Sequence, residues 1–278
     1  MYIHRKLNLY KNKIYNLLRK LSFTYFYPDK DDYYKYLTHD QLIKEKSSNK
    51  LFIFGSGYSL NEIPAKEYES INRFDTLGYN QIFKQDFVDL TFYLFREVGP
   101  HKGVAQLNDT FEDFRVNVKR HRFANTVYLL QDDLTATMTI EAETRFLMPK
   151  GSRLARLRTY SNKLVSPPKN LRDGLVHFGT TLADSLCFGY QMGYEEIVLC
   201  GVDLYDRRYF FLNAEETHLT DKGRGESKDS KHSTSNPVTS LIETWLPIFQ
   251  KKGIKLSVHN PKSLLTKILP VFDKNYSN

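Results

Sequence analysis

Two short stretches of the sequence place glycines directly after apolar runs, where backbone N–H groups could meet an anion. The first is the G-S-G turn at residues 55–57, which follows four apolar residues and precedes a helix start. The second is the G-V-D-L-Y stretch at residues 201–205, which follows another apolar run. A glycine turn that leads into a helix offers amide donors to a phosphate. Such turns also occur simply to let a strand meet a helix, so both interpretations stay open.

The common nucleotide-binding motifs are absent around the first turn. It has neither the G-K-[ST] of a P-loop nor the third glycine of a dinucleotide fingerprint. A further turn, G-T-T at residues 179–181, begins a helical stretch that ends at a Gly-Tyr corner before the second apolar run. Because ligands bind beyond the carboxyl ends of parallel strands, we expect the turns at residues 55–57 and 201–205 to face one crevice.

A long polar stretch from Asn213 to Asn236 contains two histidines that could take part in proton transfer. The stretch has almost no apolar residues and is interior to the chain, which is typical of a functional lid. His218 lies inside it and His232 near its end. An imidazole with an ordinary pKa of about 6.5 is suited to remove a hydroxyl proton at neutral pH. A histidine in a polar loop is also often just solvated.

From residue 48 onward, short apolar runs alternate with helical patterns. We expect strands at residues 51–54, 74–77, 90–94, 127–130, 197–200 and 254–258, and helices near residues 61–71, 109–120, 180–192, 237–252 and 261–268. This alternation indicates a mainly parallel sheet covered by helices. We therefore predict an α/β, Rossmann-like fold with helices on both faces of the sheet and a flexible lid at about residues 206–236.

The first 28 residues form a basic amphipathic segment. No acidic residue precedes Asp29, and the segment carries +6 of the net charge of +8. Its cations are Arg5, Lys6, Lys11, Lys13, Arg19 and Lys20. Apolar residues recur every three or four positions from Ile3 to Leu21, on one face of a helix. Such a helix suits an anionic membrane surface, and the alternative is packing against its own domain or a second subunit in a homo-oligomer. We expect a membrane-association segment at residues 1–28, a linker at 29–47 and one domain at 48–278.

Composition excludes several classes of protein. No stretch approaches the roughly 20 apolar residues of a membrane-spanning helix. The beginning of the sequence lacks an apolar run followed by a small-residue cleavage site, so we expect no signal peptide. Cys187 and Cys200 both lie in apolar runs, which favours buried thiols over a disulfide or a zinc site. Without a signal peptide or a disulfide framework, we expect a cytoplasmic protein. No nucleic-acid motif accompanies the positive charge, so we expect that it does not bind nucleic acid.

Four sequence blocks, in order across about residues 50 to 270, resemble the bacterial sialyltransferases of glycosyltransferase family 42. I-F-G-S-G-Y-S-L-N-E-I followed by F-D-T-L-G-Y-N-Q-I-F resembles the family's G-N-G-P-S-L-K-E-I turn and its Asn-Gln-Phe segment. The block from T-T to G-Y-E-E-I-V-L-C-G-V-D-L-Y is similar to the family's helix, Gly-Tyr corner and G-I-D-F-Y strand end. K-H-S-T-S-N-P resembles its His-Ser segment, and H-N-P-K-S-L-L its Pro-Asn-Ser-Leu-Leu. The resemblance does not extend to residues 1–47.

This resemblance implies a GT-A-like enzyme that needs no metal or other cofactor and moves a nonulosonic acid from its CMP-activated form to an acceptor hydroxyl with inversion. The donor-binding residues that it implies are Gly55, Ser56, Gly57, Asn80, Thr180, Thr181, Gly201 and Asp203. The hydroxyls of Tyr205 and Tyr209 would meet the negative charge that develops on the leaving phosphate. His232 would be the general base, with His218 as the competing candidate.

The sequence departs from the family pattern at several positions. Ser56 stands where the family has Asn, and Phe178, beside His177, stands where it has Arg. The second departure leaves the donor open between CMP-sialic acid and CMP-Kdo. Tyr205 and Tyr209 are four residues apart, which is closer than in the family.

Two groups of basic residues could contact a substrate or simply be solvated. Arg207 and Arg208 lie between the two tyrosines and could meet the donor's carboxylate or phosphate. The stretch at residues 153–163 could contact an acidic acceptor or form a solvated helix face. Its cations are Arg153, Arg156, Arg158 and Lys163.

Together these patterns predict a peripheral enzyme on the inner face of the plasma membrane. It would transfer sialic acid, or a related nonulosonate such as Kdo, to a lipooligosaccharide, a lipopolysaccharide or another glycan acceptor. Two alternatives stay open. One is a Rossmann-like transferase that uses another activated donor, and the other is a nucleotide-binding membrane scaffold without catalysis.

Overall fold

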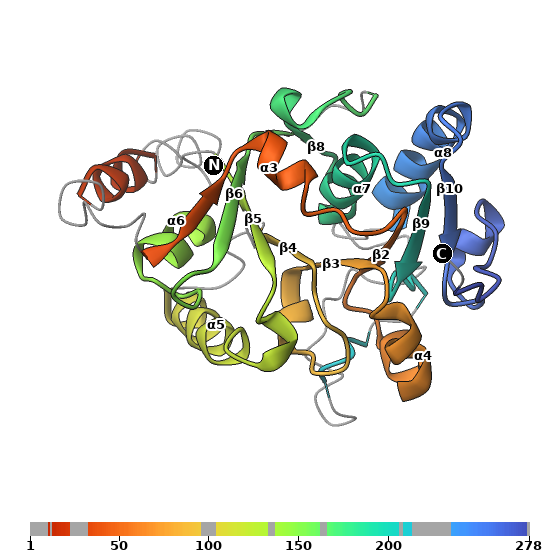
Figure 1. Cartoon of the computed structure of the whole chain (residues 1–278), viewed down its shortest axis with the longest axis horizontal. Coiled ribbons are helices and arrows are strands. Elements are labelled where there is room, and N and C mark those ends of the chain that lie inside the picture. Colours follow the sequence, from red (N-terminus) through yellow and green to blue (C-terminus); the bar gives the residue numbers. More distant parts are fainter. Residues whose placement is uncertain are drawn as a thin grey trace, which may run out of the picture.

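The computed structural model of the chain describes residues 11, 13–22, 33–95, 104–132, 137–161, 166–205, 208–212 and 235–276. Within them, an eight-stranded sheet has the order β1-β6-β5-β4-β3-β2-β9-β10, and all its neighbouring strands are parallel (Figure 1). Its strands are β1 (Lys35–Leu37), β2 (Lys50–Phe54), β3 (Asp75–Tyr79), β4 (Phe92–Phe95), β5 (Val127–Gln131), β6 (Arg153–Leu157), β9 (Glu196–Cys200) and β10 (Lys255–Val258). A separate parallel pair is formed by β7 (Thr159–Ser161) and β8 (Leu175–His177).

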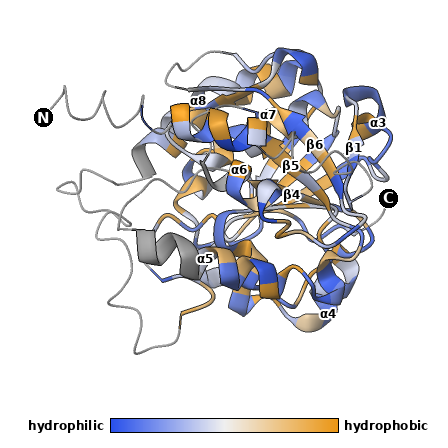
Figure 2. Ribbon diagram, turned by 90° about the vertical axis from the view of Figure 1, so that its left-hand side faces the viewer, coloured by the Kyte–Doolittle hydropathy of each residue, from blue (hydrophilic) through white to orange (hydrophobic). Residues whose placement is uncertain are grey.

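Helices cover both faces of this sheet, as predicted. One face carries α3 (His39–Ile43), α7 (Thr181–Gln191) and α8 (Ser235–Lys251). The other carries α4 (Ala65–Ile71), α5 (Val104–Asn117) and α6 (Thr137–Thr144). Figure 2 shows α7 and α8 on one side of the strands and α4 and α5 on the other. Short 3-10 helices are η1 (Tyr58–Glu62), η2 (Asn80–Lys84), η3 (His121–Phe123), η4 (Leu171–Asp173) and η6 (Leu264–Lys267).

The central strands are buried on both faces because their side chains alternate between two cores. In β2, Leu51 and Ile53 belong to one core, while Phe52 and Phe54 belong to the other. All five residues of β2 are buried, which is the pattern of a parallel strand covered on both sides. A strand of this kind is a continuous apolar run, and this property made β2 predictable from the sequence.

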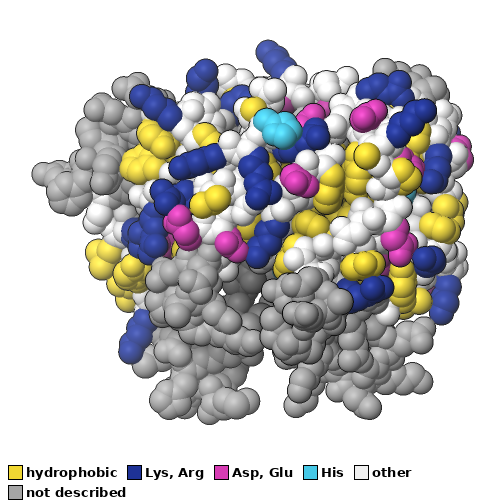
Figure 3. Space-filling model, turned by 90° about the horizontal axis from the view of Figure 1, so that it is seen from below, with side chains coloured by type: hydrophobic (Ala, Val, Ile, Leu, Met, Phe, Trp, Pro, Cys, Tyr) yellow, Lys and Arg dark blue, Asp and Glu magenta, His cyan; other side chains and the backbone are white. Residues whose placement is uncertain are grey.

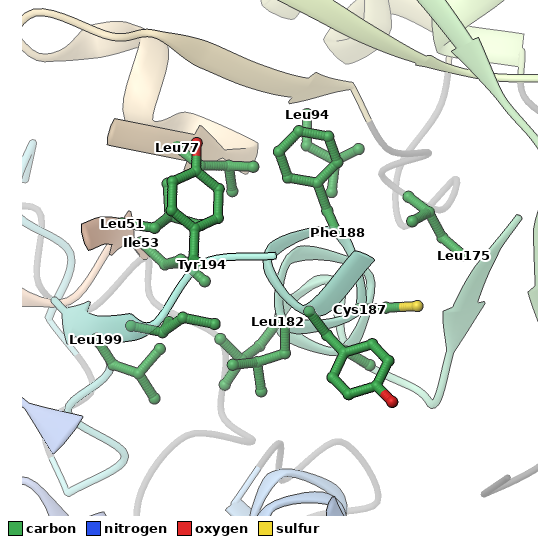
Figure 4. Close-up of a cluster of buried hydrophobic side chains, with 14 of the residues drawn as sticks. Leu51, Ile53, Leu77, Leu94, Leu175, Leu182, Cys187, Phe188, Tyr194 and Leu199 are labelled. Carbon is green, nitrogen blue, oxygen red and sulfur yellow. The ribbon is translucent and has the colours of Figure 1, made fainter. Parts of the chain in front are cut away.

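Helix α7 fills the centre of one core (Figure 4). The ring of Phe188 packs edge-on against Phe92, with centroids 5.1 Å apart. A Cβ at Gly189 would lie 2.8 Å from Ile197 Cδ1, so this glycine lets the helix approach the sheet closely. Burial raises the pKa of the Cys187 thiol to about 12. Cys187 and Cys200 are both buried free thiols, as their apolar surroundings predicted.

Residues 33–47, which we expected to form part of a linker, contribute to the sheet domain. β1 pairs in parallel with β6, and α3 places Leu42 in the core beneath α7 and α8. Tyr34, just before β1, is fully buried. Its ring packs edge-on against that of Tyr33, with centroids 4.8 Å apart. Since β1 has three residues and α3 has five, neither is long enough to show a periodic apolar pattern.

The basic stretch that begins at Arg153 forms strands β6 and β7, so its interpretation as a solvated helix face is wrong. Its arginines lie among buried residues, with Leu154 and Leu157 both at 0% exposure. The guanidinium group of Arg153 is paired with Glu45, and that of Arg156 with Glu143 of α6. These ion pairs let charged residues occupy a mostly covered strand, so β6 lacks the continuous apolar run that made β2 recognisable.

The order of the strands reverses between β2 and β9. From β2 the chain adds β3, β4, β5 and β6 on one side, and later adds β9 and β10 on the other. In open α/β sheets, ligands bind beyond the carboxyl ends of the strands at this switch point. The turns at residues 55–57 and 201–205 directly follow β2 and β9. The fold therefore brings both predicted turns to this point. Among the described residues, no helix is long and apolar enough to cross a membrane.

Candidate functional site

The two glycine turns at the switch point are in direct contact. The Gly55 N–H donates to the Cys200 carbonyl at 2.8 Å, and the Gly57 N–H donates to the Gly201 carbonyl at 2.9 Å. A Cβ at Gly55 would lie 2.6 Å from the Gly201 oxygen, and one at Gly57 only 2.4 Å from Asp203 Oδ2. Glycine is required here because the two turns approach each other so closely.

The contact between the two turns occupies backbone N–H groups that could otherwise bind an anion. The amides of residues 55 and 57 are engaged by carbonyl oxygens, and the Ser59 N–H donates to Asp203 Oδ2 at 2.9 Å. The Ser56 N–H donates to no described residue. A phosphate held at this point would therefore depend on side-chain donors as well as on backbone amides.

Asp203 is a buried carboxylate that joins three segments of the chain. Its side chain accepts hydrogen bonds from the Ser59 N–H at 2.9 Å, the Ser59 hydroxyl at 2.5 Å and Asn260 Nδ2 at 2.9 Å. Asp203 is 3% exposed, so these three donors replace the water that its charge would otherwise bind. The turn after β9 is thus fixed both to η1 and to the end of β10.

Asn260 connects this carboxylate to Tyr205. Its Nδ2 also donates to the Tyr205 hydroxyl at 3.2 Å, while its Oδ1 accepts the Lys262 N–H at 2.9 Å, which orients the amide. Burial raises the pKa of Tyr205 above its ordinary value, so its hydroxyl keeps its proton at neutral pH. Because Asn260 donates to the phenol oxygen, the O–H of Tyr205 remains to donate to another group.

Tyr209 lies beside the first turn. It forms an isolated antiparallel bridge with Gly57, and the next residue, Phe210, donates its N–H to the Ser56 carbonyl at 3.2 Å. The ring of Tyr209 stacks on the ring of Phe211, with centroids 5.1 Å apart. The structure therefore places the two predicted tyrosines next to the same pair of contacting turns.

Of the two arginines between these tyrosines, Arg208 is described and Arg207 lies outside the described residues. The guanidinium carbon of Arg208 lies 3.7 Å from the centre of the Tyr58 ring. A cation at this distance from an aromatic face is attracted by the ring's negative charge distribution. The stacked Arg208 brings a positive charge to the entrance of the first turn.

Asn80 and Thr181 form a further side of the site, one strand along from β2. Asn80 directly follows β3 and has φ 54°, a left-handed conformation that asparagine tolerates. Its Oδ1 accepts the Thr181 hydroxyl at 3.2 Å, and its carbonyl accepts the Tyr93 hydroxyl at 2.6 Å. Thr180 is the N-cap of α7, and its hydroxyl accepts the Leu182 N–H at 3.3 Å. These contacts join the start of α7 to the end of β3.

A histidine–aspartate pair lies beside this helix start and was not predicted. His177 Nδ1 is 2.6 Å from Asp184 Oδ2, with the side chains 18% and 1% exposed. Asp184 Oδ1 has no hydrogen-bond partner among the described residues. When the Asp184 oxygen accepts the Nδ1–H, Nε2 is left as an acceptor, so His177 has the geometry of a proton acceptor. The two residues lie on different elements, and no sequence pattern joined them.

His232 and His218 lie outside the described residues. Pro237, which follows His232 by five positions in the sequence, is described. A Cβ at Gly179, which has φ +64°, would lie 3.9 Å from Pro237 Cβ near the start of α8. Among the described residues, no group of three or more His, Cys, Asp and Glu side chains is placed to hold a metal ion.

His259, the neighbour of Asn260, belongs to a buried network that includes α4. Its Nε2 is 2.9 Å from Glu67 Oε1, and Lys274 Nζ is 3.1 Å from Oε2. The Tyr276 hydroxyl also donates to Oε1. Burial lowers the pKa of His259, and this effect exceeds the opposing effect of Glu67. Burial raises the pKa of Glu67, but the hydrogen bonds from Tyr276, His259 and Lys274 together lower it below its ordinary value.

We expect acid to weaken this network. Because both folded-state pKa values lie below the unfolded ones, the unfolded chain binds more protons. The stabilisation is therefore complete above the unfolded His pKa of about 6.5 and is lost progressively as pH falls past that value and past about 4.3. Urea unfolding between about pH 4 and pH 8 measures this loss. His259→Gln should reduce the pH dependence of the unfolding free energy above about pH 5. Glu67→Gln should reduce it below about pH 5. An unchanged slope in both variants would contradict the assignment.

No protein-family model and no curated protein matches the sequence. The chain is similar to solved structures of two sialyltransferases from Campylobacter jejuni. CstII in complex with cytidine-5'-monophosphate has 17% sequence identity and a TM-score of 0.44, over 82% of this chain and 87% of that one. CstII in complex with CMP-3FNeuAc has 18% identity and a TM-score of 0.48, over 82% and 88%. The monofunctional alpha-2,3-sialyltransferase Cst-I has 16% identity and a TM-score of 0.46, over 83% and 82%.

Proposed function

We propose that this chain is an inverting, CMP-sugar-dependent glycosyltransferase that uses no metal. It transfers sialic acid, or a related nonulosonate such as Kdo, to a hydroxyl of a lipooligosaccharide, a lipopolysaccharide or another glycan. One observation carries the proposal. Three of the four sequence blocks that resemble family 42 are far apart in the chain, yet they meet through the Gly57–Gly201 contact and the link from Asp203 to Asn260 and Tyr205.

The leaving group determines what this site must supply. Departure of CMP breaks the bond between the anomeric carbon and a phosphate oxygen, and the electron pair stays on that oxygen. Donors aimed at the developing charge lower the barrier, and one such donor is typically worth about 3 kcal/mol. In this proposal the Tyr205 O–H donates to the leaving oxygen, and Asn260 holds the phenol from the other side. Tyr209 is the second donor.

The remaining predicted residues hold the donor substrate. The turns at residues 55–57 and 201–203 bound the nucleotide, and Asn80 and Thr181 face it from the adjacent strand and the start of α7. Asn80 Oδ1 already accepts the Thr181 hydroxyl, so its amide nitrogen remains available for the nucleotide or its phosphate. His232 accepts the acceptor's proton as the hydroxyl attacks the anomeric carbon.

Ligand-dependent thermal unfolding tests the donor class. A ligand that binds only the folded state raises its stability by RT ln(1 + [L]/Kd), so CMP at 100 times its Kd should add about 2.7 kcal/mol. We expect CMP to raise the unfolding temperature, and UMP, UDP, GDP and adenosylmethionine not to do so. Stabilisation by another of these ligands alone would favour a transferase with a different donor.

Donor hydrolysis separates catalysis from binding alone. Without an acceptor, a transferase should slowly release CMP from CMP-sialic acid or CMP-Kdo, because water replaces the acceptor hydroxyl. The sugar whose nucleotide is hydrolysed faster identifies the donor. A protein that binds CMP but hydrolyses neither sugar nucleotide would be the scaffold.

A further inference from the structure

The helix at residues 13–22 turns its apolar side away from the protein. Ile14 is 59% exposed, Leu18 58% and Leu21 58%, and the flanking Tyr15 and Leu17 are 54% and 44% exposed. These residues lie at steps of one, three and four positions and so form one side of the helix. The apolar stripe does not pack on the part of the domain that the structure describes, which argues against one of the two alternatives to a membrane contact.

The opposite, polar side of the same helix attaches it to the domain. Asn16 is fully buried. Arg19 Nη1 donates to Glu141 Oε1 of α6 at 2.5 Å, and its Nε donates to the Thr144 hydroxyl at 2.9 Å. The Glu141 side chain is 6% exposed, so this ion pair is partly shielded from water. The apolar side is therefore held outward in a defined orientation.

This helix lies at the carboxyl ends of the strands, as the two glycine turns do. Lys20 Nζ is 3.5 Å from Asp132 Oδ1, and Asp132 directly follows β5. The helix at residues 13–22, dark red in Figure 1, lies beside α6, on the side of the sheet where β1 is the edge strand. β5 and β2 are three strands apart, which corresponds to about 15 Å at their carboxyl ends. An object bound to the helix would thus lie near the candidate site.

The charge of residues 1–28 indicates which kind of partner the apolar side of the helix contacts. Lys and Arg side chains are interspersed with Asp and Glu on the face shown in Figure 3, whereas residues 1–28 contain six cations and no acid. Arg19 and Lys20 are paired with Glu141 and Asp132, so two copies meeting through this segment would bring +4 against +4. A helical partner of mixed charge would normally be matched by residues of both signs along the edges of the apolar stripe. An anionic lipid surface complements both the cations and the aliphatic side chains.

We propose that the helix at residues 13–22 docks the protein on an anionic lipid bilayer, with its apolar side inserted and the carboxyl edge of the sheet directed toward the lipid. Leu17, Leu18 and Leu21 enter the interface. Lys13 lies on this helix and Lys11 precedes it by two positions, and both contact lipid phosphates. This inference does not depend on the proposed function, since lipid binding requires neither donor nor acceptor.

Sedimentation of the full chain with vesicles tests this proposal. We expect binding to phosphatidylcholine vesicles that contain phosphatidylglycerol, weaker binding to pure phosphatidylcholine, and a loss of binding as salt is raised. The double substitution Leu18→Glu and Leu21→Glu should lower the bound fraction at least about tenfold. Both side chains are exposed, so the thermal unfolding temperature should stay unchanged.

The matched control is Val116→Glu, because Val116 is an equally exposed apolar residue, at 55%, on α5. We expect it to bind vesicles as the unmodified chain does. Equal vesicle binding by the Leu18/Leu21 variant would overturn the proposal. So would a chain that is dimeric in solution and becomes monomeric through that double substitution, since the apolar side would then bind a second copy.

Discussion

Substitution of His232 by Ala is expected to reduce transfer by about 10²- to 10⁴-fold, the usual contribution of a general base. The acceptor hydroxyl must lose its proton as it attacks, and His232 lies near the end of the polar stretch at residues 213–236. The affinity for CMP should stay nearly the same, because in the proposed site the nucleotide contacts the turns at residues 55–57 and 201–203 and not His232. Initial-rate kinetics and CMP titration measure the two quantities separately.

His177 provides the competing outcome, because the structure pairs it with Asp184. Removal of His177 alone leaves a buried carboxylate without its partner, and we expect His177→Ala to cost about 3 kcal/mol of unfolding free energy. The double variant with Asp184→Asn should recover much of this stability, because an amide carries no charge. If the recovered double variant has lost transfer while His232→Ala retains it, His177 is the base.

Substitution of Gly57 by Ala should have the second large effect. Gly57 has φ −72° and ψ 157°, a conformation that any residue adopts, so only the lack of space requires glycine. The added methyl group would lie 2.4 Å from Asp203 Oδ2 and 2.7 Å from the Gly201 oxygen, and real Cβ atoms do not approach so closely. Asp203 would have to leave its three donors. We expect a loss of about 2–4 kcal/mol in urea unfolding and at least a tenfold weaker CMP affinity.

Gly253→Ala is the matched control for this substitution. A Cβ at Gly253 meets nothing within 4 Å, but the residue has φ +75°. The expected cost is therefore about 1 kcal/mol of backbone strain, with CMP affinity unchanged. If Gly57→Ala were as stable as Gly253→Ala and bound CMP normally, the contact between the turns would not support the donor site.

The sequence predicted those parts of the fold whose signal is local. Strand β2 is a continuous apolar run and α7 follows a turn with a Thr N-cap, so both were located without the structure. β6 was missed because its arginines are neutralised by Glu45 and Glu143, which lie in other parts of the chain. β1 and α3 were missed because they are too short to show a period.

The same distinction between local and non-local sequence signals applies to the candidate site. Glycines and tyrosines could be identified because they occur in short ordered motifs. The link from Asp203 to Asn260, and the pair of His177 with Asp184, join residues of different elements. Side-chain partners of this kind depend on how the elements are placed in three dimensions, and a single sequence does not contain that information.

The contact between the two glycine turns also affects when the site can form. Ser59 and Asp203 are separated by 144 positions, and Asn260 follows still later in the chain. A nascent chain that ends before β10 contains Ser59 but lacks Asn260, which holds both Asp203 and Tyr205. Such non-local contacts form late in folding, because long loops must first close. Nucleotide affinity would therefore appear only once nearly the whole polypeptide is synthesised, which makes it a direct reporter of complete folding.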